Sequence, residues 1–419
     1  MYIESITIKN FRVFREATVE FVHADRRPTD ELPVPKRPNI NLLLGNNGLG
    51  KTTLLKAVSL TALGPAVTDS GIYPYMLIRR EPGSHAEANT ESSADHQNGE
   101  TPAASIEAVF KVHPQDLASS PILKSLVTIT KKGELERLRW RPGDEDAWRP
   151  IFSSSNNAFF CVGYGATRRV EKVKNADTAG RRQGLFPRAQ RIQGLFEDAY
   201  SLLPLAAWLP SLEDQEPGRF QEVVSLVNRL LGRGRYRFTR EMEDKEYIFK
   251  RGGLRAPFPA LSDGYRAYLG WIGDLLYHVC STCPPNCKIT DNRGIVMVDE
   301  IDLHIHPKWQ INMLPVLARA LPNIQFIVTS HSPLAAGSLE WMNIILMTPG
   351  PNQTSLPRRL KLPVSGLDAD QMLLTDFFGL RSTRAPAKES RLRALTEQAR
   401  AGDVKAAKTL LRELANGME

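Results

Sequence analysis

The sequence of 419 residues has no long apolar segment and contains only four cysteines. No run approaches the ~18 apolar residues that a membrane-spanning helix needs. Residues 1–5 carry no positive flank or apolar stretch of the signal-peptide kind. Four cysteines in a chain of this length do not make a disulfide framework. These absences predict a soluble, cytoplasmic protein that does not contact a membrane.

The charge is basic and unevenly distributed. The chain has 54 basic and 46 acidic side chains, a net charge of +8. Residues 165–255 alone hold 18 basic and 12 acidic side chains, or +6. A basic excess suits an acidic partner such as nucleic acid. The sequence therefore assigns any such partner to this region.

Short runs that are apolar throughout alternate with helical patterns. Such runs occupy residues 39–44, 294–298 and 324–329. Strands without polar alternation are typical of a parallel sheet that is covered on both faces. Residues 80–106 are rich in Ser, Glu, Ala, Asn and His and show no apolar period, which predicts a mobile surface loop.

The strongest chemical signal is a segment with P-loop spacing between a buried strand and a helix. Its residues are Gly45, Asn46, Asn47, Gly48, Leu49, Gly50, Lys51, Thr52 and Thr53. Glycines let backbone N–H groups close around phosphate oxygens at the positive end of a helix. Lys51 supplies a charge for the outer phosphates, and the Thr52 hydroxyl can bind Mg²⁺. The segment predicts ATP and Mg²⁺ as cofactors.

An acidic pair, Asp299 and Glu300, follows the buried strand 294–298. Ligands of open α/β sheets bind at the carboxyl ends of the strands. Asp299 is expected to hold Mg²⁺ through water, and Glu300 to orient the attacking water. Without the P-loop, such a pair would be an ordinary solvated strand end.

Two further segments gain meaning from their order in the chain. Ser262 and Gly264 lie at the start of a helix about thirty residues before the acidic pair, and His331 follows the next buried strand. Ser before an apolar helix is usually an N-cap, and a lone histidine is usually structural. The order P-loop, Ser-Asp-Gly, acidic pair and histidine favours functional roles.

This order resembles the ABC-type ATPase heads of the RecF and SMC group. The resemblance implies that Ser262 and Gly264 are the signature loop, which closes on the γ-phosphate held by a second subunit. It implies that His331 is the switch histidine that senses this phosphate. Residues 8–12 also look like the first strand of that group, which adds Arg12 to the nucleotide-binding residues.

Residues 299–307 and 163–168 look more closely like the compact AAA-domain ATPases of bacterial anti-phage systems, the Septu-type and retron-associated ATPases. The implied fold is an α/β P-loop NTPase of ABC-ATPase head type. It has a mixed sheet with parallel core strands, helices on both faces and a helical arm insertion.

The predicted domains follow from this fold. They are an N-terminal lobe with the P-loop (1–188), a helical and basic arm (189–255), a C-terminal lobe with the signature, acidic pair and histidine (256–349), and a C-terminal helical region (350–419). About two hundred residues separate P-loop and signature without sustained heptads, so a long SMC coiled coil is excluded.

Two departures from the family pattern stay open. Residues 304–307, His-Ile-His-Pro, stand where transporters carry their D-loop, so the coupling between subunits can differ. No glutamine marks a Q-loop. Residues 164–168 either take its place or cap a strand.

Four side chains have a spacing that zinc sites use. They are His278, Cys280, Cys283 and Cys287. They form either a zinc site or a Pro-rich loop with incidental thiols, since only one C-x-x-C pair is present.

Basic and aromatic residues interleave at residues 235–238. This alternation suits a nucleic-acid backbone, but it also describes a strand with one wet face.

Three functions are consistent with these features. The first is a defence ATPase that forms a head-to-tail homodimer on two ATP molecules and controls a separate effector, a nuclease or toxin. The second is a RecF-like DNA-repair ATPase that clamps on DNA. The third is a transporter ATPase subunit, against which Asp-Glu-Ile-Asp at residues 299–302 and Leu-Ser-Asp-Gly at 261–264 argue. The chain shows no nuclease constellation of its own.

Overall fold

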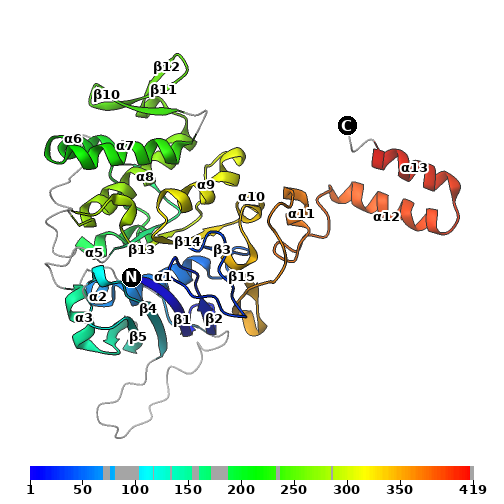
Figure 1. Cartoon of the computed structure of the whole chain (residues 1–419). Helices are drawn as coiled ribbons and strands as arrows, with labels where there is room; N and C mark the ends of the chain where they lie inside the picture. The colour runs from blue at the N-terminus through cyan, green and yellow to red at the C-terminus, as the bar shows by residue number, and fades with distance from the viewer. Residues whose placement is uncertain are drawn as a thin grey trace, which may run out of the picture. The chain divides into compact units, whose positions relative to one another are not determined.

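The structure is a computed structural model that describes residues 1–68, 76–80, 103–116, 118–132, 135–152, 160–170, 187–232, 236–284 and 286–415. The chain divides into two compact units, Met1–Gly366 and Leu367–Glu419, drawn in Figure 1. The first unit contains all the predicted nucleotide motifs.

A six-stranded sheet forms the centre of the first unit. Its order is β16-β15-β3-β14-β13-β7, and all neighbours are parallel except β15 and β16. The strands are β3 (Ile40–Leu44), β7 (Cys161–Tyr164), β13 (Gly294–Val298), β14 (Ile324–Ser330), β15 (Ile344–Pro349) and β16 (Ser355–Arg358). Every residue of β3, β13 and β14 is buried. The predicted mixed sheet with parallel core strands is confirmed.

A second, antiparallel sheet has the order β2-β1-β4-β5-β6. Its strands are β1 (Tyr2–Phe11), β2 (Phe14–Glu20), β4 (Ala104–Lys111), β5 (Ile122–Lys132) and β6 (Leu135–Pro142). Buried and exposed residues alternate along β2 and β4, as expected for a sheet with one wet face. Most of the loop predicted at residues 80–106 lies outside the described residues, and residues 104–106 begin β4.

Helix α1 (Lys51–Ala62) lies between the two sheets and joins them into one core. Ten of its twelve residues are buried. The shared core contains side chains from α1 and from both sheets, among them Leu54, Val58, Ile106, Ile129, Met297 and Ile327. Because α1 follows the P-loop directly, this packing also holds the P-loop in place.

Two buried amide side chains connect the sheets. Gln325 of β14 accepts from the Ile3 amide (2.9 Å) and donates to the Ile3 and Val22 carbonyls (2.9 and 3.0 Å). Asn41 of β3 accepts from the Val22 amide and donates to its carbonyl, both at 2.8 Å. Both side chains are fully buried, so these bonds satisfy backbone groups that water cannot reach.

The other face of the parallel sheet carries helices and the arm, stacked in layers in Figure 1. The arm contains two helices, as predicted, but its basic residues 237–257 form a three-stranded antiparallel sheet, β10-β11-β12. The elements on this side are α6 (Leu205–Gln215), α7 (Pro217–Leu231), β10 (Arg237–Glu243), β11 (Glu246–Arg251), β12 (Leu254–Pro257), α8 (Asp263–Thr282) and α9 (Pro307–Ala320). The alternating segment around residue 237 is thus a strand of this small sheet.

The remaining elements of the first unit are short. They are α2 (Gly64–Thr68), α3 (Glu145–Phe152), β8 (Arg169–Val170), α5 (Pro187–Gln190), β9 (Ser201–Leu202) and α10 (Pro333–Gly337). In the described part of the chain, no helix is both long and apolar enough to cross a membrane.

The second unit is helical, with α11 (Ala369–Leu373), α12 (Pro386–Arg400) and α13 (Val404–Ala415). The predicted boundary at residue 350 is corrected to residues 366 and 367. The reason is that β16 pairs with β15 and extends the head sheet to Arg358.

We expect Gln325→Leu to lower the free energy of unfolding by about 3 kcal/mol, because it removes the side-chain partner of the buried amide and carbonyl of Ile3 and one of the two donors to the Val22 carbonyl. Urea unfolding followed by circular dichroism measures the loss. Gln215→Leu, at an exposed position, is the matched control, with an expected change below about 0.5 kcal/mol. Equal unfolding midpoints for the two variants would contradict the role assigned to Gln325.

Candidate nucleotide site

The P-loop runs from the end of β3 to the start of α1, and its backbone requires glycine at two points. Gly50, the residue before α1, has φ 82°, and a Cβ there would lie 2.4 Å from Cγ2 of Val13. Gly45 has φ 140°, and a Cβ there would lie 2.6 Å from the Met347 carbonyl oxygen. Neither position accepts a side chain, because the conformation is left-handed and the space is filled. The loop geometry is that of a phosphate cradle at a helix N-terminus.

Lys51 points back over this loop. Its Nζ donates to the carbonyl oxygens of Gly45 (2.7 Å) and Asn46 (3.0 Å). Burial lowers the pKa of Lys51, while the carboxylates of Asp299, Glu300 and Asp302 act in the opposite direction. The lysine therefore stands between the P-loop and the acidic residues after β13.

A chain of hydrogen bonds joins the P-loop to the acidic pair. The Thr52 hydroxyl donates to Oδ2 of Asp299 (2.7 Å), and the Thr329 hydroxyl donates to Oδ1 (2.6 Å). Thr329 also accepts from the amide of Glu300 (2.6 Å). Residues that are 247 positions apart in the sequence thus meet at one point. The parallel register explains why, since β3, β14 and β13 end at the same edge of the sheet.

Arg168 supports the acidic pair from the other side, a contact that the two alternatives for residues 164–168 did not include. Its guanidinium donates to the carbonyl oxygens of Asp299 (2.5 Å), Glu300 (2.8 Å) and Gly165 (3.2 Å). Burial lowers the pKa of Arg168 to about 10, opposed by the nearby carboxylates of Asp299, Asp302 and Glu300. Arg168 follows β7, and β7 pairs in parallel with β13. The position of Arg168 directly after a buried strand could have indicated its place near the acidic pair. The segment 164–168 therefore braces the acidic pair.

Glu300 and Asp302 lie in the turn after β13. Glu300 has φ 45°, an uncommon conformation for a residue with a side chain. The Arg168 and Thr329 bonds to its backbone hold this turn. Oδ1 of Asp302 is buried and has no hydrogen-bond partner. A buried carboxylate oxygen without a partner is costly unless a cation or water meets it.

His331 follows β14 at the same edge of the sheet. Burial and then the charge of Lys51 lower its pKa, while Asp302, Glu300 and Asp299 raise it. These influences place the imidazole among the same charged groups as the P-loop lysine. Lys51, Thr52, Asp299, Glu300 and His331 thus lie at the same edge of the sheet, and their roles toward a nucleotide stay predictions.

The residues present fit a nucleotide with a divalent cation. The P-loop glycines exclude side chains from the loop, as close approach to phosphate requires. The Thr52 hydroxyl and the Asp299 carboxylate meet at 2.7 Å, and Asp302 adds the unpartnered oxygen. Hydroxyl and carboxylate oxygens are the donors that Mg²⁺ prefers.

Arg12 lies at the edge of this site. Its backbone has φ 49°, and its Nε donates to the Met76 carbonyl (3.2 Å). Its charge lowers the pKa of Lys56 on α1, after the larger effect of burial. Arg12 is therefore close to the helix that follows the P-loop, and its contact with nucleotide stays a prediction.

The predicted signature turn starts α8 and contacts the loop after the acidic pair. Ser262 is the N-cap of α8 and makes no side-chain cap hydrogen bond. A Cβ on Gly264 would lie 2.8 Å from the His304 carbonyl oxygen. No hydrogen bond described in the structure joins Ser262 or Gly264 to the P-loop of the same chain. These two residues are thus separate from the cluster around Lys51.

Of the two alternatives for the cysteines near the end of α8, the described geometry favours the loop with incidental thiols. In the described part of the chain, no three His, Cys, Asp or Glu side chains are grouped as metal ligands. His278 lies on α8 and faces Asp274, with Nε2 3.3 Å from Oδ2. Burial raises the pKa of Cys283 to about 11 and also raises that of Cys280. The thiols pack in the end of α8 and the turn after it.

Two protein-family descriptions match the chain. An AAA-domain family matches residues 5–136. A second AAA-domain family, whose description also names an AbiEii toxin of a type IV toxin–antitoxin system, matches residues 173–336. Together these matches include the P-loop, the signature turn, the acidic pair and His331.

Several characterised proteins are similar in sequence. The Septu protein PtuA of Bacillus mycoides is 24% identical over 93% of this chain and 46% of its own length. The protein named "Retron Ec83 probable ATPase" of Escherichia coli is 42% identical over 22% of this chain and 17% of its own length. The matched part of the chain therefore spans 46% of the length of this PtuA protein. It spans 17% of the length of the retron protein.

Among solved structures, an Smc head bound to the C-terminal winged-helix domain of ScpA is 14% identical, with a TM-score of 0.49 over 86% of this chain and 98% of that one. The parallel sheet, P-loop and acidic pair described above define the fold independently of this likeness. The chain has the α/β fold of a P-loop NTPase, with a mixed sheet and helices on both faces, and it is similar to AAA-domain families and to the Septu and retron ATPases to which its sequence motifs pointed.

Proposed function

We propose that the chain binds ATP with Mg²⁺ and hydrolyses it to ADP and phosphate as a slow, regulatory ATPase. The observation that carries this proposal is the Thr52–Asp299–Thr329–Glu300 chain of hydrogen bonds. It places the P-loop and the acidic pair at one edge of the sheet, where phosphoryl transfer needs them together.

The roles follow from the chemistry of each group. The backbone of the P-loop holds the phosphates, and Lys51 adds a positive charge. Thr52 and Asp299 hold the cation. Glu300 orients the attacking water, and His331 contacts the terminal phosphate.

We further propose that two chains dimerise head to tail on two ATP molecules, with Ser262 and Gly264 of one subunit completing the site of the other. Three features of the signature turn support this. Ser262 is exposed, its hydroxyl is not used as a helix cap, and it precedes a helix of 20 residues. A helix N-terminus with free donors attracts phosphate. Such a protein has two states, separate subunits and dimer, and bound ATP shifts the equilibrium between them.

We propose that this switch controls a separate effector, a nuclease or toxin, in anti-phage defence. The similarity to a Septu protein and to retron ATPases supports this role. A RecF-like DNA-repair ATPase shares the same ATP chemistry, and identification of the proteins that co-purify with the native complex separates the two functions.

Lys51→Ala should weaken ATP binding by about 100-fold, because a charge-assisted contact to phosphate contributes about 1.5–3 kcal/mol. Titration with a fluorescent ATP analogue measures the affinity. Lys388→Ala on α12, exposed and outside the site, should leave the affinity unchanged. Wild-type affinity for a folded Lys51→Ala protein would contradict the assignment of the P-loop.

Glu300→Gln should still bind ATP but hydrolyse it 10²–10⁴-fold more slowly, about the contribution of a positioned catalytic base. It should therefore accumulate as a dimer when ATP is present, which light scattering detects. If this variant binds ATP yet stays monomeric at every protein concentration tested, the head-to-tail arrangement is wrong.

Arg168→Met should reduce the hydrolysis rate by about 10²-fold, because loss of the carbonyl contacts lets the acidic pair shift. ATP affinity should change little, since Arg168 bonds only to protein backbone in the described contacts. Arg169→Met, exposed on β8, is the matched control. Equal rates for the two variants would show that Arg168 does not position Glu300.

A further inference from the structure

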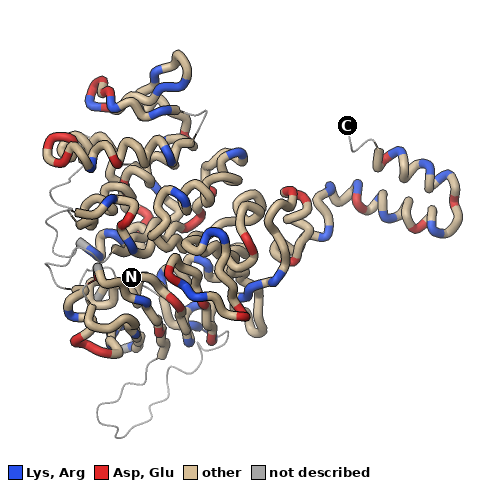
Figure 2. The backbone as a smooth tube through the Cα atoms, in the orientation of Figure 1, with Lys and Arg blue, Asp and Glu red and all other residues tan. Residues whose placement is uncertain are grey.

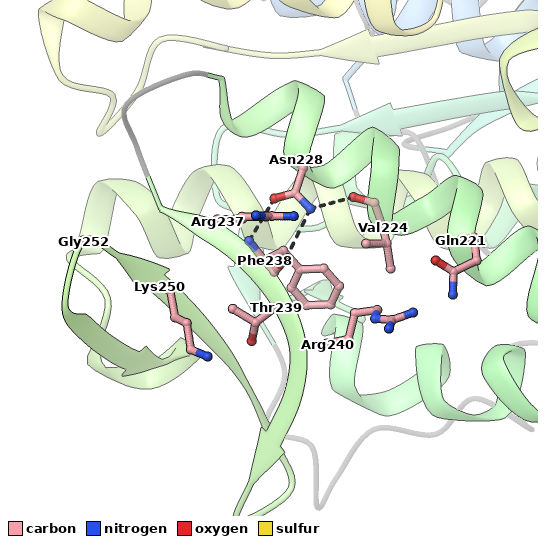
Figure 3. A pocket seen from close by; sticks show the side chains of 9 residues that line it. All are labelled: Gln221, Val224, Asn228, Arg237, Phe238, Thr239, Arg240, Lys250 and Gly252. Atoms are coloured by element: carbon pink, nitrogen blue, oxygen red, sulfur yellow. Dashed lines mark hydrogen bonds between the residues drawn. The ribbon is translucent and has the colours of Figure 1, made fainter.

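A long groove runs along the arm, away from the predicted nucleotide residues. It consists of two adjoining hollows of about 670 and 970 Å³ that share Gln221, Val224, Asn228 and Arg237. One wall is α7, another is the β10–β11 hairpin, and the third is α9. Figure 3 shows the end of the groove between α7 and the hairpin.

The walls of the groove are basic. The cations that line it are Arg229, Arg237, Arg240, Lys250 and Arg319. No acidic residue is among the described residues that line either hollow. Four of the five are arginines, whose planar guanidinium matches phosphate oxygens in pairs. The groove therefore presents a positive surface on three different elements.

Three of these arginines are available to a ligand. Arg229, Arg237 and Arg319 are exposed, and none takes part in the ion pairs that the structure describes. Arg240 instead lies over the Phe220 ring, with 5.9 Å between Cζ and the ring centroid. Lys250 forms an ion pair with Glu241. The available charge is thus spread over α7, β10 and α9.

The shape of the groove is held by Asn228. Its side chain accepts from the Phe238 amide (3.0 Å) and donates to the Phe238 and Val224 carbonyls (3.3 and 3.0 Å). Figure 3 shows these bonds between α7 and β10, with Arg237 beside them. The two walls are therefore fixed before any ligand binds, which reduces the entropy cost of binding.

The acidic residues of the arm lie partly on the hairpin, where Glu241 pairs with Lys250 and Arg255, and partly at the start of α7. Glu213, Asp214 and Glu216 are at the turn between α6 and α7, whereas Arg229 is in the last turn of α7. Figure 2 shows the acidic and basic ends of this helix pair. Within this helix pair, the charge separation favours a polyanion near the end of α7 that carries Arg229.

One ring in the groove contacts the signature turn. Tyr236 lines the larger hollow and packs against Tyr265, with centroids 4.9 Å apart. Tyr265 packs in turn on Trp309 at the start of α9, with centroids 4.2 Å apart. An occupant of the groove thus lies one aromatic contact away from the turn that carries Ser262 and Gly264.

We propose that this groove binds the phosphate backbone of single-stranded nucleic acid, and that Arg229, Arg237 and Arg319 contact its phosphates. A concave basic track with an aromatic ring in its wall is the arrangement that proteins use for single strands. Binding senses the backbone, so it is independent of base sequence. This proposal goes beyond ATP hydrolysis, and its test is carried out without ATP.

The test compares two double variants of the full chain. Arg237→Gln with Arg319→Gln removes two charges from opposite walls of the groove. Arg137→Gln with Arg141→Gln removes two charges from exposed positions on β6 and serves as the matched control. Fluorescence anisotropy with a labelled oligonucleotide of about 16 nucleotides, near the upper size of known single-strand sites, measures affinity without ATP at several salt concentrations.

The groove variant should bind the single strand at least tenfold more weakly than wild type. The slope of log K against log[salt] should become shallower by about 1.4, since each phosphate contact on a single strand contributes about 0.7. The control variant should match wild type. Circular dichroism establishes that both variants are folded.

Three results would overturn the proposal. One is equal affinity of the folded groove variant and the control. Another is tighter binding of the corresponding duplex than of the single strand. The third is equal competition by a poly-glutamate peptide, which would assign the groove to an acidic protein. Because none of these measurements uses ATP, they stand apart from the tests of ATP hydrolysis.

Discussion

The carboxylate of Asp299 is the point at which the parts of the head meet. It accepts hydrogen bonds from Thr52 after the P-loop and from Thr329 of β14, and Arg168 holds its backbone carbonyl from the end of β7. Four elements from distant parts of the chain thus converge on one residue. A buried acceptor of this kind needs all its donors in place. The register of the parallel strands sets the positions of these donors, so it also sets the geometry of the site.

The same constraint explains the architecture around the site. Helix α1 packs between the two sheets, and the amides Asn41 and Gln325 bond the strands of one sheet to the backbone of the other. A shift of either sheet would move the P-loop relative to Asp299. Because packed cores deform little, a rigid core supports the phosphate cradle.

The arm adds a second chemical surface that is physically connected to the first. Its groove is lined by arginines of α7, β10 and α9, and α9 follows the loop of the acidic pair. Contacts among Tyr236, Tyr265 and Trp309 link the groove to the signature turn. These contacts offer a route by which a ligand on the arm and a nucleotide in the head can bias each other, provided that the contacts differ between two states.

Local patterns predicted much of this molecule. The apolar runs predicted the parallel strands, and the glycine spacing predicted the P-loop, because both depend on residues that are neighbours in sequence. The alternation at residues 235–238 left a strand and a nucleic-acid contact open, and the β10–β11 pairing shows that Arg237 and Phe238 lie in a strand. Spacing alone left zinc and incidental thiols open, because it does not say that His278 faces Asp274 on the same helix.

The sequence by itself indicated the class of chemistry: the P-loop is a short motif whose residue types suit phosphate, and the order of the acidic pair and His331 after it pointed to the same site. Only the tertiary structure decided which distant residues join them. Arg168, Thr329 and the unpartnered Asp302 oxygen became visible through strand order, and the basic groove through the packing of the arm on α9. The physical reason is that hydrogen bonds and electrostatic fields act over distances in space, which a linear pattern does not contain.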